Sequence, residues 1–305
     1  MRQFVMRRFL RAIVALWGIS TIVFIVMRLS GDPIPLLLPP EASRAEIEAY
    51  RHKLGLDAPL YVQYIIFLRN AVTGDFGRSL RYDRPAMDLA IERLPATLEL
   101  AFAAGFLAIV VAIPVGILSA LKPNSLADNL AMILALIGQS APTFYIGIML
   151  ILIFSVNLQL FPTGGRGEPS QLVLPAVTLG AFAMASIARL TRSEMLEVIR
   201  KDYIRTARAK GLADLTIVLR HAFKNAAIPI VTITGLQFGL LLGGAVVTET
   251  VFSWPGIGRL AIQSIYGRDY PVVQAVVFLT ATMFIVLNFL VDLTYGLLDP
   301  RISYS

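Results

Sequence analysis

Apolar residues fill six runs of the chain, and the charged residues collect between these runs. A transmembrane helix needs about 20 consecutive, mostly apolar residues, and each run approaches or exceeds that length. The pattern therefore predicts an all-α polytopic membrane protein with six transmembrane helices. The predicted spans are roughly residues 9–29, the interval between 99 and 122, 130–154, 172–188, 226–248 and 271–291.

The basic residues at the start of the chain orient the first span. Arg2, Arg7, Arg8 and Arg11 lie before or within the first turn of this span, and basic residues concentrate on the cytoplasmic side of membrane proteins. We expect residues 12–27 to stay in place as a signal-anchor helix, because no small-residue cleavage site follows Arg28. Six spans then return the C-terminus to the cytoplasm as well.

The chain divides by this pattern into an N-terminal anchor with an extracytoplasmic segment (1–93), a five-helix transmembrane domain (94–298) and a cytoplasmic tail (299–305). Within the first part, Ser43 and Glu46 form a capping-box pattern that opens a short helix ending near Gly55. A second helix is expected after Pro59. Its predicted apolar face consists of Leu60, Tyr64, Phe67, Leu68 and Val72.

Residues 189–225 form the most polar stretch, and they separate the fourth and fifth predicted spans. Its nine basic residues are Arg189, Arg192, Arg200, Lys201, Arg205, Arg208, Lys210, Arg220 and Lys224. Its four acidic residues are Glu194, Glu197, Asp202 and Asp214. Such an excess of positive charge between two spans is typical of a cytoplasmic loop.

The same stretch carries the pattern of two helices. Gly211 stands where a left-handed residue ends a helix, and Asp214 is expected to cap the next one. The first helix has an apolar stripe at helical spacing, formed by Leu196, Ile199, Tyr203 and Ala207. The second carries Ile217, Val218, Ala222 and Phe223. These features predict a rigid helix–turn–helix beneath the membrane.

Composition agrees with a membrane protein. Hydrophobic residues make up 56% of the chain and charged residues 15%, whereas soluble domains have about 25% charged residues. The net charge of +7 is explained by basic loops that face an anionic leaflet rather than by nucleic-acid binding. The absence of cysteine excludes disulfides, iron–sulfur clusters and thiol catalysis.

Enzyme chemistry within the chain is not expected. The sequence has no phosphate-binding Gly-x-x-x-x-Gly-Lys-Ser/Thr loop, so any ATP would have to bind to a separate subunit. Its two histidines, His52 and His221, fall on opposite sides of the predicted membrane and cannot share a metal ion. We therefore predict no catalytic, cofactor-binding or metal-binding residues.

Several motifs in order resemble one known family. The strings DYIRTARAKGL (202–212), RHAFKNA (220–226), TETVFSWPGIGR (248–259), RDYPVVQ (268–274) and LLDPRI (297–302) resemble the first permease of the dipeptide/oligopeptide/nickel/glutathione ATP-binding cassette (ABC) importers of bacteria. The resemblance covers about residues 1–302. Arg205, Thr206 and Ala207 occupy the Glu-Ala-Ala positions of that family's EAA loop, and Gly211 and Pro229 follow.

This resemblance implies the MetI-like fold of type I ABC importer permeases in the bacterial inner membrane. It also implies a hetero-oligomer with a second permease, two ATPase subunits that bind ATP and magnesium, an extracytoplasmic solute-binding protein and membrane lipid. The residues that would contact the ATPase are Arg205, Thr206, Ala207, Arg208, Lys210, Gly211 and Leu212. The expected function is alternating-access transport of short peptides, with nickel complexes or opine and sugar conjugates as alternatives.

Other readings remain open for each of these features. The basic loop can also be a solvated loop or a lipid-headgroup contact, and the chain can also be an ion-coupled transporter or a membrane scaffold. Glu249 is either a functional group at a span end or an interfacial carboxylate in water. Phe252 and Trp254 belong either to an aromatic belt or to an outer gate, as the resemblance implies. Gln139 and Gln237 either line a pathway or bond between helices.

Overall fold

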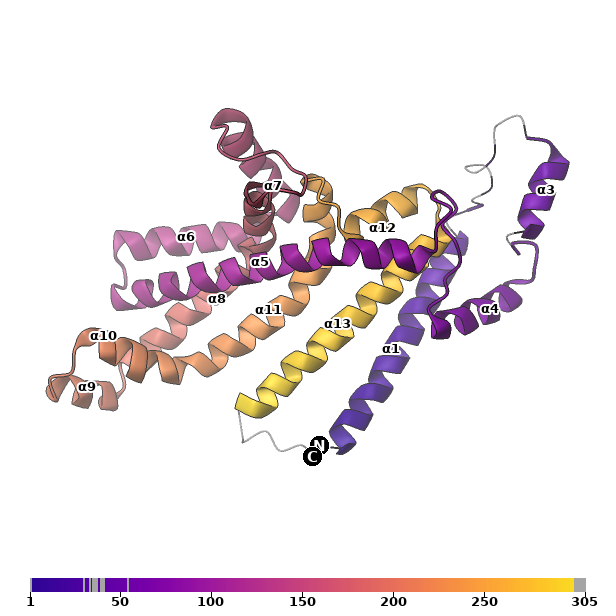
Figure 1. Cartoon of the computed structure of the whole chain (residues 1–305). Coiled ribbons are helices and arrows are strands. Elements are labelled where there is room, and N and C mark those ends of the chain that lie inside the picture. Colours follow the sequence, from indigo (N-terminus) through magenta and orange to yellow (C-terminus); the bar gives the residue numbers. More distant parts are fainter. Residues whose placement is uncertain are drawn as a thin grey trace. The chain divides into compact units, whose positions relative to one another are not determined.

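The computed structural model describes residues 2–29, 31–32, 34, 38, 42–53 and 55–298, and the predicted tail 299–305 lies outside the described residues. Every regular element among the described residues is a helix (Figure 1). The helices are α1 (Arg2–Leu29), α3 (Arg44–Lys53), α4 (Leu60–Thr73), α5 (Ala86–Leu121), α6 (Leu126–Ser140), α7 (Thr143–Leu150), α8 (Pro169–Ile199), α9 (Asp202–Ala209), α10 (Asp214–Thr216), α11 (Lys224–Val251), α12 (Ile257–Tyr266) and α13 (Tyr270–Leu298). Two π-helical stretches, η1 (Ile151–Asn157) and η2 (Ile217–Phe223), continue α7 and α10.

The helices account for the predicted spans. Five helical stretches are long and apolar enough to cross a membrane: 10–29, 86–121, 169–199, 214–251 and 270–287. The pair formed by α6 and α7–η1 passes the same test together, but it bends by 117°. The count of six spans therefore holds if this bent pair is one span. The all-α class predicted from the sequence is confirmed.

The bend lies where the sequence places Gln139, Ser140, Ala141 and Pro142. Proline has no backbone N–H and disfavours a helical conformation in the residue before it. Ala141 accordingly adopts an extended backbone with φ −77° and ψ 138°, and α6 ends at Ser140. The local chemistry predicts a kink here, and the structure has a full break.

The chain forms two compact units. The first contains the described residues of 1–97 together with 255–286, and the second contains residues 98–254 and the described residues of 287–303. In the first unit, α1, α4 and α13 meet in an aromatic core. The ring of Phe67 lies 5.4 Å from that of Phe24 and 6.2 Å from that of Phe76. The ring of Phe76 is in turn 5.2 Å from that of Phe278.

A buried carboxylate joins the 74–85 loop to the start of α13 in the same unit. Asp269 accepts hydrogen bonds from the Ser79 hydroxyl at 2.5 Å and from the Leu80 amide at 3.1 Å. Burying a charge requires such hydrogen bonds. The loop is therefore fixed to α13 although 190 positions of sequence separate Ser79 from Asp269.

Helix α5 begins at Ala86, so it extends back from the predicted span into the segment expected outside the membrane. One prediction for the first unit needs correction. The buried face of α4 consists of Gln63, Phe67 and Ala71, whereas Leu60 and Val72 of the predicted face are exposed. The capping box at Ser43 is confirmed, because the Ser43 amide donates to Glu46 Oε2 at 2.8 Å.

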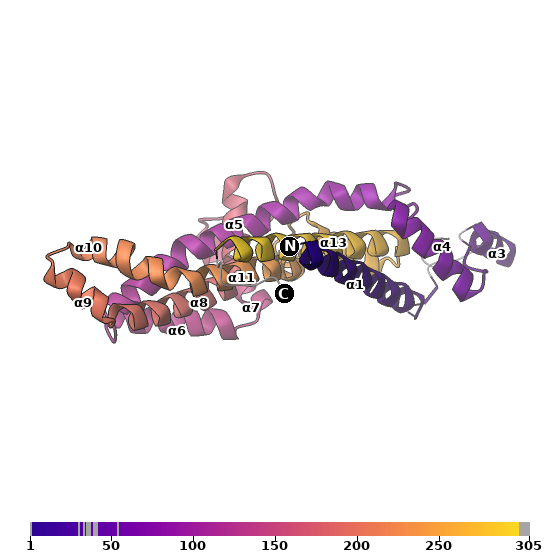
Figure 2. The same cartoon turned by 90° about the horizontal axis from the view of Figure 1, so that it is seen from below.

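Helix α8 is the centre of the second unit and contacts α6, α7 and α11. Figures 1 and 2 both show α8 and α11 side by side, with α9 and α10 at one end of the pair. Small residues permit close approach of the part of α5 in this unit. A Cβ at Gly116 would lie only 2.6 Å from the Cβ of Thr191 on α8.

Candidate functional site

The basic hairpin (residues 189–225) is built from the end of α8, the short helix α9 and the return arm of α10 and η2. Helix α8 runs into the hairpin without interruption as far as Ile199. The backbone then turns at Arg200 and Lys201, and Lys201 is extended with φ −73° and ψ 149°. The prediction of one continuous helix up to Gly211 is therefore wrong, because α9 is a separate helix.

This turn changes which residues are buried. On the final turns of α8 the buried side chains are Met195 and Val198, one position before the predicted Leu196 and Ile199. On α9 they are Ile204 and Ala207, and Tyr203 is 41% exposed. Ala207 is therefore buried as predicted, whereas Tyr203 is not. A break shifts the phase of the helical period, so a stripe extrapolated across it holds only in part.

Gly211 ends α9 as predicted. Its φ is +73°, a left-handed conformation that favours glycine. The Gly211 amide donates to the carbonyl of Arg208 at 2.9 Å, and the Leu212 amide donates to the carbonyl of Ala207 at 3.4 Å. These two bonds form a Schellman motif, which satisfies the last carbonyls of the helix. The bend at Gly211 is thus confirmed.

The return arm differs from the prediction at its start. Ala213 is the N-cap residue of α10, and Asp214 is the first helical residue, with no side-chain capping bond. Asp214 therefore acts only through its charge near the positive end of the helix. Ile217, Val218 and Ala222 of η2 are buried as expected. Since η2 contacts both α8 and α9, these side chains hold the hairpin together.

The outer surface of α9 is cationic. Arg205, Arg208 and Lys210 are exposed, and among the described residues these three form one ion pair, between Arg205 and Asp202 at 3.6 Å. The hydroxyl of Thr206 donates back to the carbonyl of Asp202 at 3.1 Å. The hairpin thus presents its cations to solvent from a short, well-anchored helix.

Exposed apolar side chains accompany these cations. Leu212 is exposed, and so are Leu215 and Leu219 on the return arm, of which Leu215 is 69% exposed. Leu212 was named from the sequence, whereas the other two were missed. The sequence pattern that could have identified them is their spacing of three or four residues from Leu212 onward, which places them on a different face from the buried Ile217 and Val218. Cations beside apolar residues are suited to contact with a protein partner.

A charge pair between Glu197 and Lys201 reinforces the base of the hairpin. Lys201 Nζ lies 3.0 Å from Glu197 Oε1, four positions earlier in the chain. This carboxylate raises the pKa of Lys201, first by its hydrogen bond and then by its charge. The lysine is therefore held in its charged form at the point where α8 ends.

A second charge pair, not predicted from the sequence, joins α6 to α8. Both guanidinium nitrogens Nε and Nη2 of Arg192 donate to the carboxylate of Asp128 at 2.7 Å. Asp128 is 1% exposed and Arg192 25%. The sequence feature that could have indicated this pair is the lone aspartate early in an apolar run, because such a charge needs a cation nearby.

Three of the predicted gate residues lie together in the second unit. Glu249, Phe252 and Trp254 are all buried, and Glu249 has 0% exposure. The Trp254 amide donates to the Glu249 carbonyl at 2.8 Å. The interpretation of Glu249 as a carboxylate in water is therefore wrong, because the side chain is fully buried.

The loop between η1 and α8 packs against this cluster. The Gly165 amide donates to the Phe252 carbonyl at 2.9 Å. Arg166 lies above the Trp254 ring, 5.9 Å from its centroid, and forms an ion pair with Glu99 at 2.7 Å. The loop before α8 is thus joined to the residues after α11 by a backbone hydrogen bond and a cation–π contact, and to α5 by an ion pair.

The two predicted pathway glutamines lie elsewhere. Gln139 accepts a hydrogen bond from Arg189 on α8. Gln237 is buried in α11, three turns before Glu249, which corresponds to about 18 Å along a helix. The structure therefore does not bring either glutamine to the Glu249 cluster. No group of His, Cys, Asp and Glu suited to a metal ion occurs among the described residues.

Comparison with known proteins gives a consistent assignment. The family profile described as "Binding-protein-dependent transport system inner membrane component" matches residues 112–304. The profile for the N-terminal part of such membrane components matches residues 1–101. Together the two profiles cover most of the chain.

Curated relatives match over the whole length. The glutathione transport system permease protein GsiC of Escherichia coli K12 is 44% identical over 306 residues, with 100% of both chains covered. The dipeptide transport system permease protein DppB of Alkalihalophilus pseudofirmus is 41% identical over 333 residues, again with 100% of both covered.

Solved structures show the same fold. The MetNI methionine ABC transporter in an inward-facing conformation matches with a TM-score of 0.58 and 23% identity, covering 70% of this chain and 97% of the other. An amino acid ABC transporter matches with a TM-score of 0.54 and 18% identity, covering 68% and 94%. The predicted MetI-like permease fold is confirmed. The chain therefore belongs to the family of binding-protein-dependent transport system inner membrane components and is a permease subunit of an ABC importer.

Proposed function

We propose that this permease carries short peptides of the dipeptide and glutathione class. The observation that supports this most directly is the full-length similarity to a glutathione permease, 44% identical, and to a dipeptide permease, 41% identical. Glutathione and dipeptides are both small peptides, so the shared solute chemistry is a short backbone with charged ends.

The basic hairpin is the part through which ATP hydrolysis would drive transport. Arg205, Arg208 and Lys210 form its cationic surface on α9. Thr206, Ala207, Gly211 and Leu212 complete the predicted contact. Two features support a docking role over a merely solvated loop: the buried side chains that anchor α9, and the Schellman motif that fixes its end.

The assembly that fits this role contains a second permease, two ATPase subunits that bind ATP and magnesium, and an extracytoplasmic solute-binding protein. The hairpin and both chain termini would then face the cytoplasm. The α3–α4 segment and the Glu249 cluster would face the other side. The excess of basic residues in 189–225 supports this orientation.

The Glu249 cluster is our candidate for the outer gate. Glu249, Phe252 and Trp254 are buried, and Phe252 and Trp254 contact the loop that carries Gly165 and Arg166. A carboxylate held inside a membrane protein is a functional candidate by default. Movement of α11 relative to this loop would uncover the cluster, as an outward-open state requires.

Reconstitution tests the proposal. The permease pair, the ATPase subunits and the binding protein would be placed in lipid vesicles, and uptake of a labelled dipeptide and of glutathione would be measured. We expect ATP-dependent uptake that an ionophore leaves unchanged. Uptake that needs an ion gradient and no ATP would contradict the mechanism, and ATP-dependent uptake of nickel complexes alone would contradict the solute class.

A further inference from the structure

A small cavity in the first unit is lined by aromatic rings together with a cationic, an anionic and several amide side chains. It has a volume of about 190 Å³ and lies between α1, α4, the 74–80 loop and the start of α13. Drug-sized ligand pockets measure about 300–1,000 Å³. This cavity is therefore suited to a ligand the size of an amino acid, a very short peptide or a lipid headgroup.

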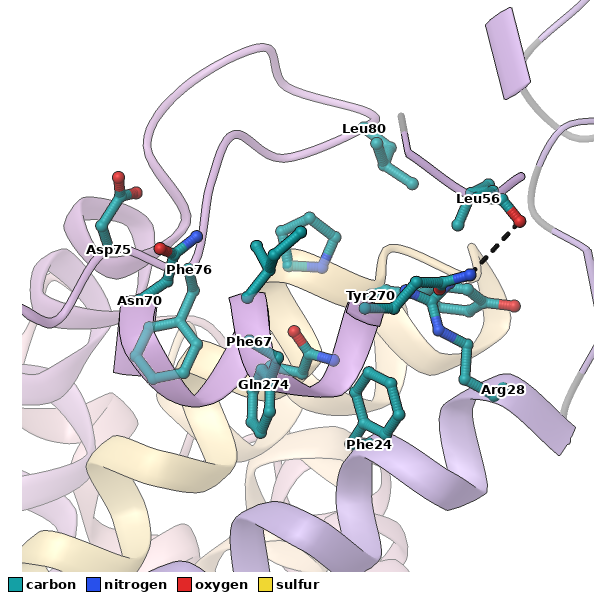
Figure 3. Close-up of a pocket in the computed structure, with 13 residues that line it drawn as sticks. Phe24, Arg28, Leu56, Phe67, Asn70, Asp75, Phe76, Leu80, Tyr270 and Gln274 are labelled. Carbon is teal, nitrogen blue, oxygen red and sulfur yellow. Dashed lines mark hydrogen bonds between the residues drawn. The ribbon is translucent and has the colours of Figure 1, made fainter. Parts of the chain in front are cut away.

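Gln63 supplies a buried acceptor on the cavity wall. The side chain is 8% exposed, and its Nε2 donates to the carbonyls of Ala58 at 2.7 Å and Leu56 at 3.3 Å. The bond to Leu56 is drawn in Figure 3. These bonds fix the orientation of the amide. Its Oε1 is buried and has no partner in the described part of the chain. A buried acceptor of this kind normally has a partner.

Arg28 supplies a cation at one end. Its guanidinium lies 5.3 Å from the Phe24 ring centroid and 5.4 Å from that of Tyr270. No ion pair to Arg28 occurs among the described residues, and its buried Nε has no partner there. The acid four positions later, Asp32, pairs with Arg51 instead. The aromatic rings thus hold a guanidinium whose Nε has no hydrogen-bond partner among the described residues.

Asp75 supplies an anion at the other end. Figure 3 shows Asp75 and Asn70 at one side of the cavity, with Arg28 and Tyr270 at the opposite side. One oxygen of Asp75 accepts a hydrogen bond from the Gly77 amide at 2.9 Å. Within the described residues no ion pair engages this carboxylate. The rings of Phe67 and Phe76 line the space between the two ends.

We propose that this cavity binds a small zwitterion, with its oxyanion on Arg28, its ammonium group toward Asp75 and a donor on Gln63 Oε1. A guanidinium is the preferred partner of carboxylate and phosphate oxygens. Two sources share this chemistry: a free amino acid or short peptide, and the headgroup of phosphatidylethanolamine. The site is separate from the transport path proposed above and does not depend on the solute of that path.

The experiment uses the full chain with its partner permease in nanodiscs of phosphatidylglycerol alone. The probe is alanyl-alanine, compared with its N-acetyl and C-terminal amide forms, each of which lacks one charge. We expect saturable binding that removal of either charge weakens about tenfold or more, the effect of losing one charge-assisted hydrogen bond. The lipid arm measures, by native mass spectrometry, phosphatidylethanolamine retained by the same complex from a mixed bilayer.

Ligand and side-chain changes are then combined. Asp75→Asn keeps the acceptor for Gly77 and should remove the preference for the free ammonium group. Arg28→Gln should remove the preference for the free carboxylate. In the lipid arm both variants should retain less phosphatidylethanolamine. Glu48→Gln, an exposed acid of α3 outside the cavity, is the control and should change nothing.

The outcomes separate the sources and can refute the site. Dipeptide binding identifies a soluble ligand, and retained phosphatidylethanolamine that Asp75→Asn reduces identifies the lipid. The proposal is overturned if neither ligand binds. It is also overturned if both variants keep the wild-type preference between charged and uncharged probes, a comparison that does not depend on equal stability of the variants.

Discussion

At the scale of single residues, Gly211 carries the sharpest requirement on side-chain type. Its φ of +73° is strained for a residue with a Cβ, while a Cβ placed there would meet no atom within 4 Å. The cost of substitution is therefore conformational rather than steric, about 1–2 kcal/mol for most residues and less for asparagine.

Gly211→Val should consequently disturb the end of α9 and lower peptide-stimulated ATP hydrolysis and uptake severalfold, whereas Gly211→Asn should stay close to wild type. Both are measured in vesicles with the partner subunits. Equal activity of the valine and asparagine variants would show that the left-handed turn does not matter for coupling.

The Asp128–Arg192 pair makes a second prediction at this scale. Asp128→Asn removes the charge that two guanidinium bonds of 2.7 Å engage, so the arginine loses its ionised partner. Removing one partner of a buried pair is costly, and Arg192 is partly exposed, so we expect a loss of about 2 kcal/mol. Thermal unfolding in detergent, followed by tryptophan fluorescence, measures this loss.

The matched control removes both charges. An apolar replacement of a buried pair is often neutral. Asp128→Leu combined with Arg192→Met should therefore be more stable than Asp128→Asn alone. If the double variant is less stable than Asp128→Asn, the pair contributes a net stabilisation beyond cancelling the cost of burying each charge.

At the scale of helices, the sequence predicted which helices form better than it predicted which of their faces are buried. The hairpin, its stop at Gly211 and the break before Pro142 all follow from local backbone chemistry. The turn at Arg200–Lys201 does not, because neither position is glycine or proline. Burial of Ile204 on α9, which contacts the return arm, accompanies this turn. Tertiary packing there overrides local preference.

The buried face of α4 was mispredicted for a different reason. Ile65 and Ile66 are exposed, while Gln63 is buried. The amide of Gln63 donates to the carbonyls of Ala58 and Leu56. A polar side chain with such bonds can be buried, so an apolar stripe alone does not identify the packed face. The sequence also did not show that Glu249 is buried, because its position at a span end fits an interfacial carboxylate equally well.

Close helix contacts give a prediction at this scale. A Cβ at Gly243 of α11 would meet nothing within 4 Å. A Cβ at Gly116 of α5 instead lies 2.7 Å from the carbonyl oxygen of Ala188. Gly116→Ala should destabilise the isolated chain by about 1–3 kcal/mol through overpacking. Gly243→Ala should be neutral or slightly stabilising, since alanine favours helix.

Thermal unfolding of the two single variants in detergent checks this pair. The comparison is matched because both changes add one methyl group to a membrane helix. Equal effects of the two substitutions would mean that the approach of α5 to α8 at Gly116 does not limit stability.

At the scale of the whole molecule, composition and motif order sufficed for fold class and family. Apolar runs predicted six spans, which holds if the bent pair of α6 and α7–η1 is one span. The ordered motifs led to the permease family that two family profiles match. The cavity beside Arg28 was beyond such reasoning. Its parts come from residues 24–80 and 270–274, and nothing in the sequence indicates that these segments meet.

Assembly with the ATPase subunits provides the last prediction, because three roles for the basic hairpin differ in what they require. A solvated loop tolerates reversal of its charges, a lipid contact depends on anionic lipid, and a docking surface depends on the partner protein. Arg205 and Arg208 are exposed, so the variant Arg205→Glu/Arg208→Glu should fold normally.

We expect this variant to bind the ATPase subunits at least about tenfold more weakly in detergent without lipid, as for loss of a close charge pair at an interface. Added salt should weaken the wild-type complex in the same direction. Arg44→Glu/Arg69→Glu reverses two exposed arginines of α3 and α4 and should leave binding unchanged. If the hairpin variant binds normally in detergent and fails only in vesicles of anionic lipid, the cations contact the bilayer. If it works normally in both, the hairpin transmits force through its apolar residues alone, with Leu215 and Leu219 as the next positions to change.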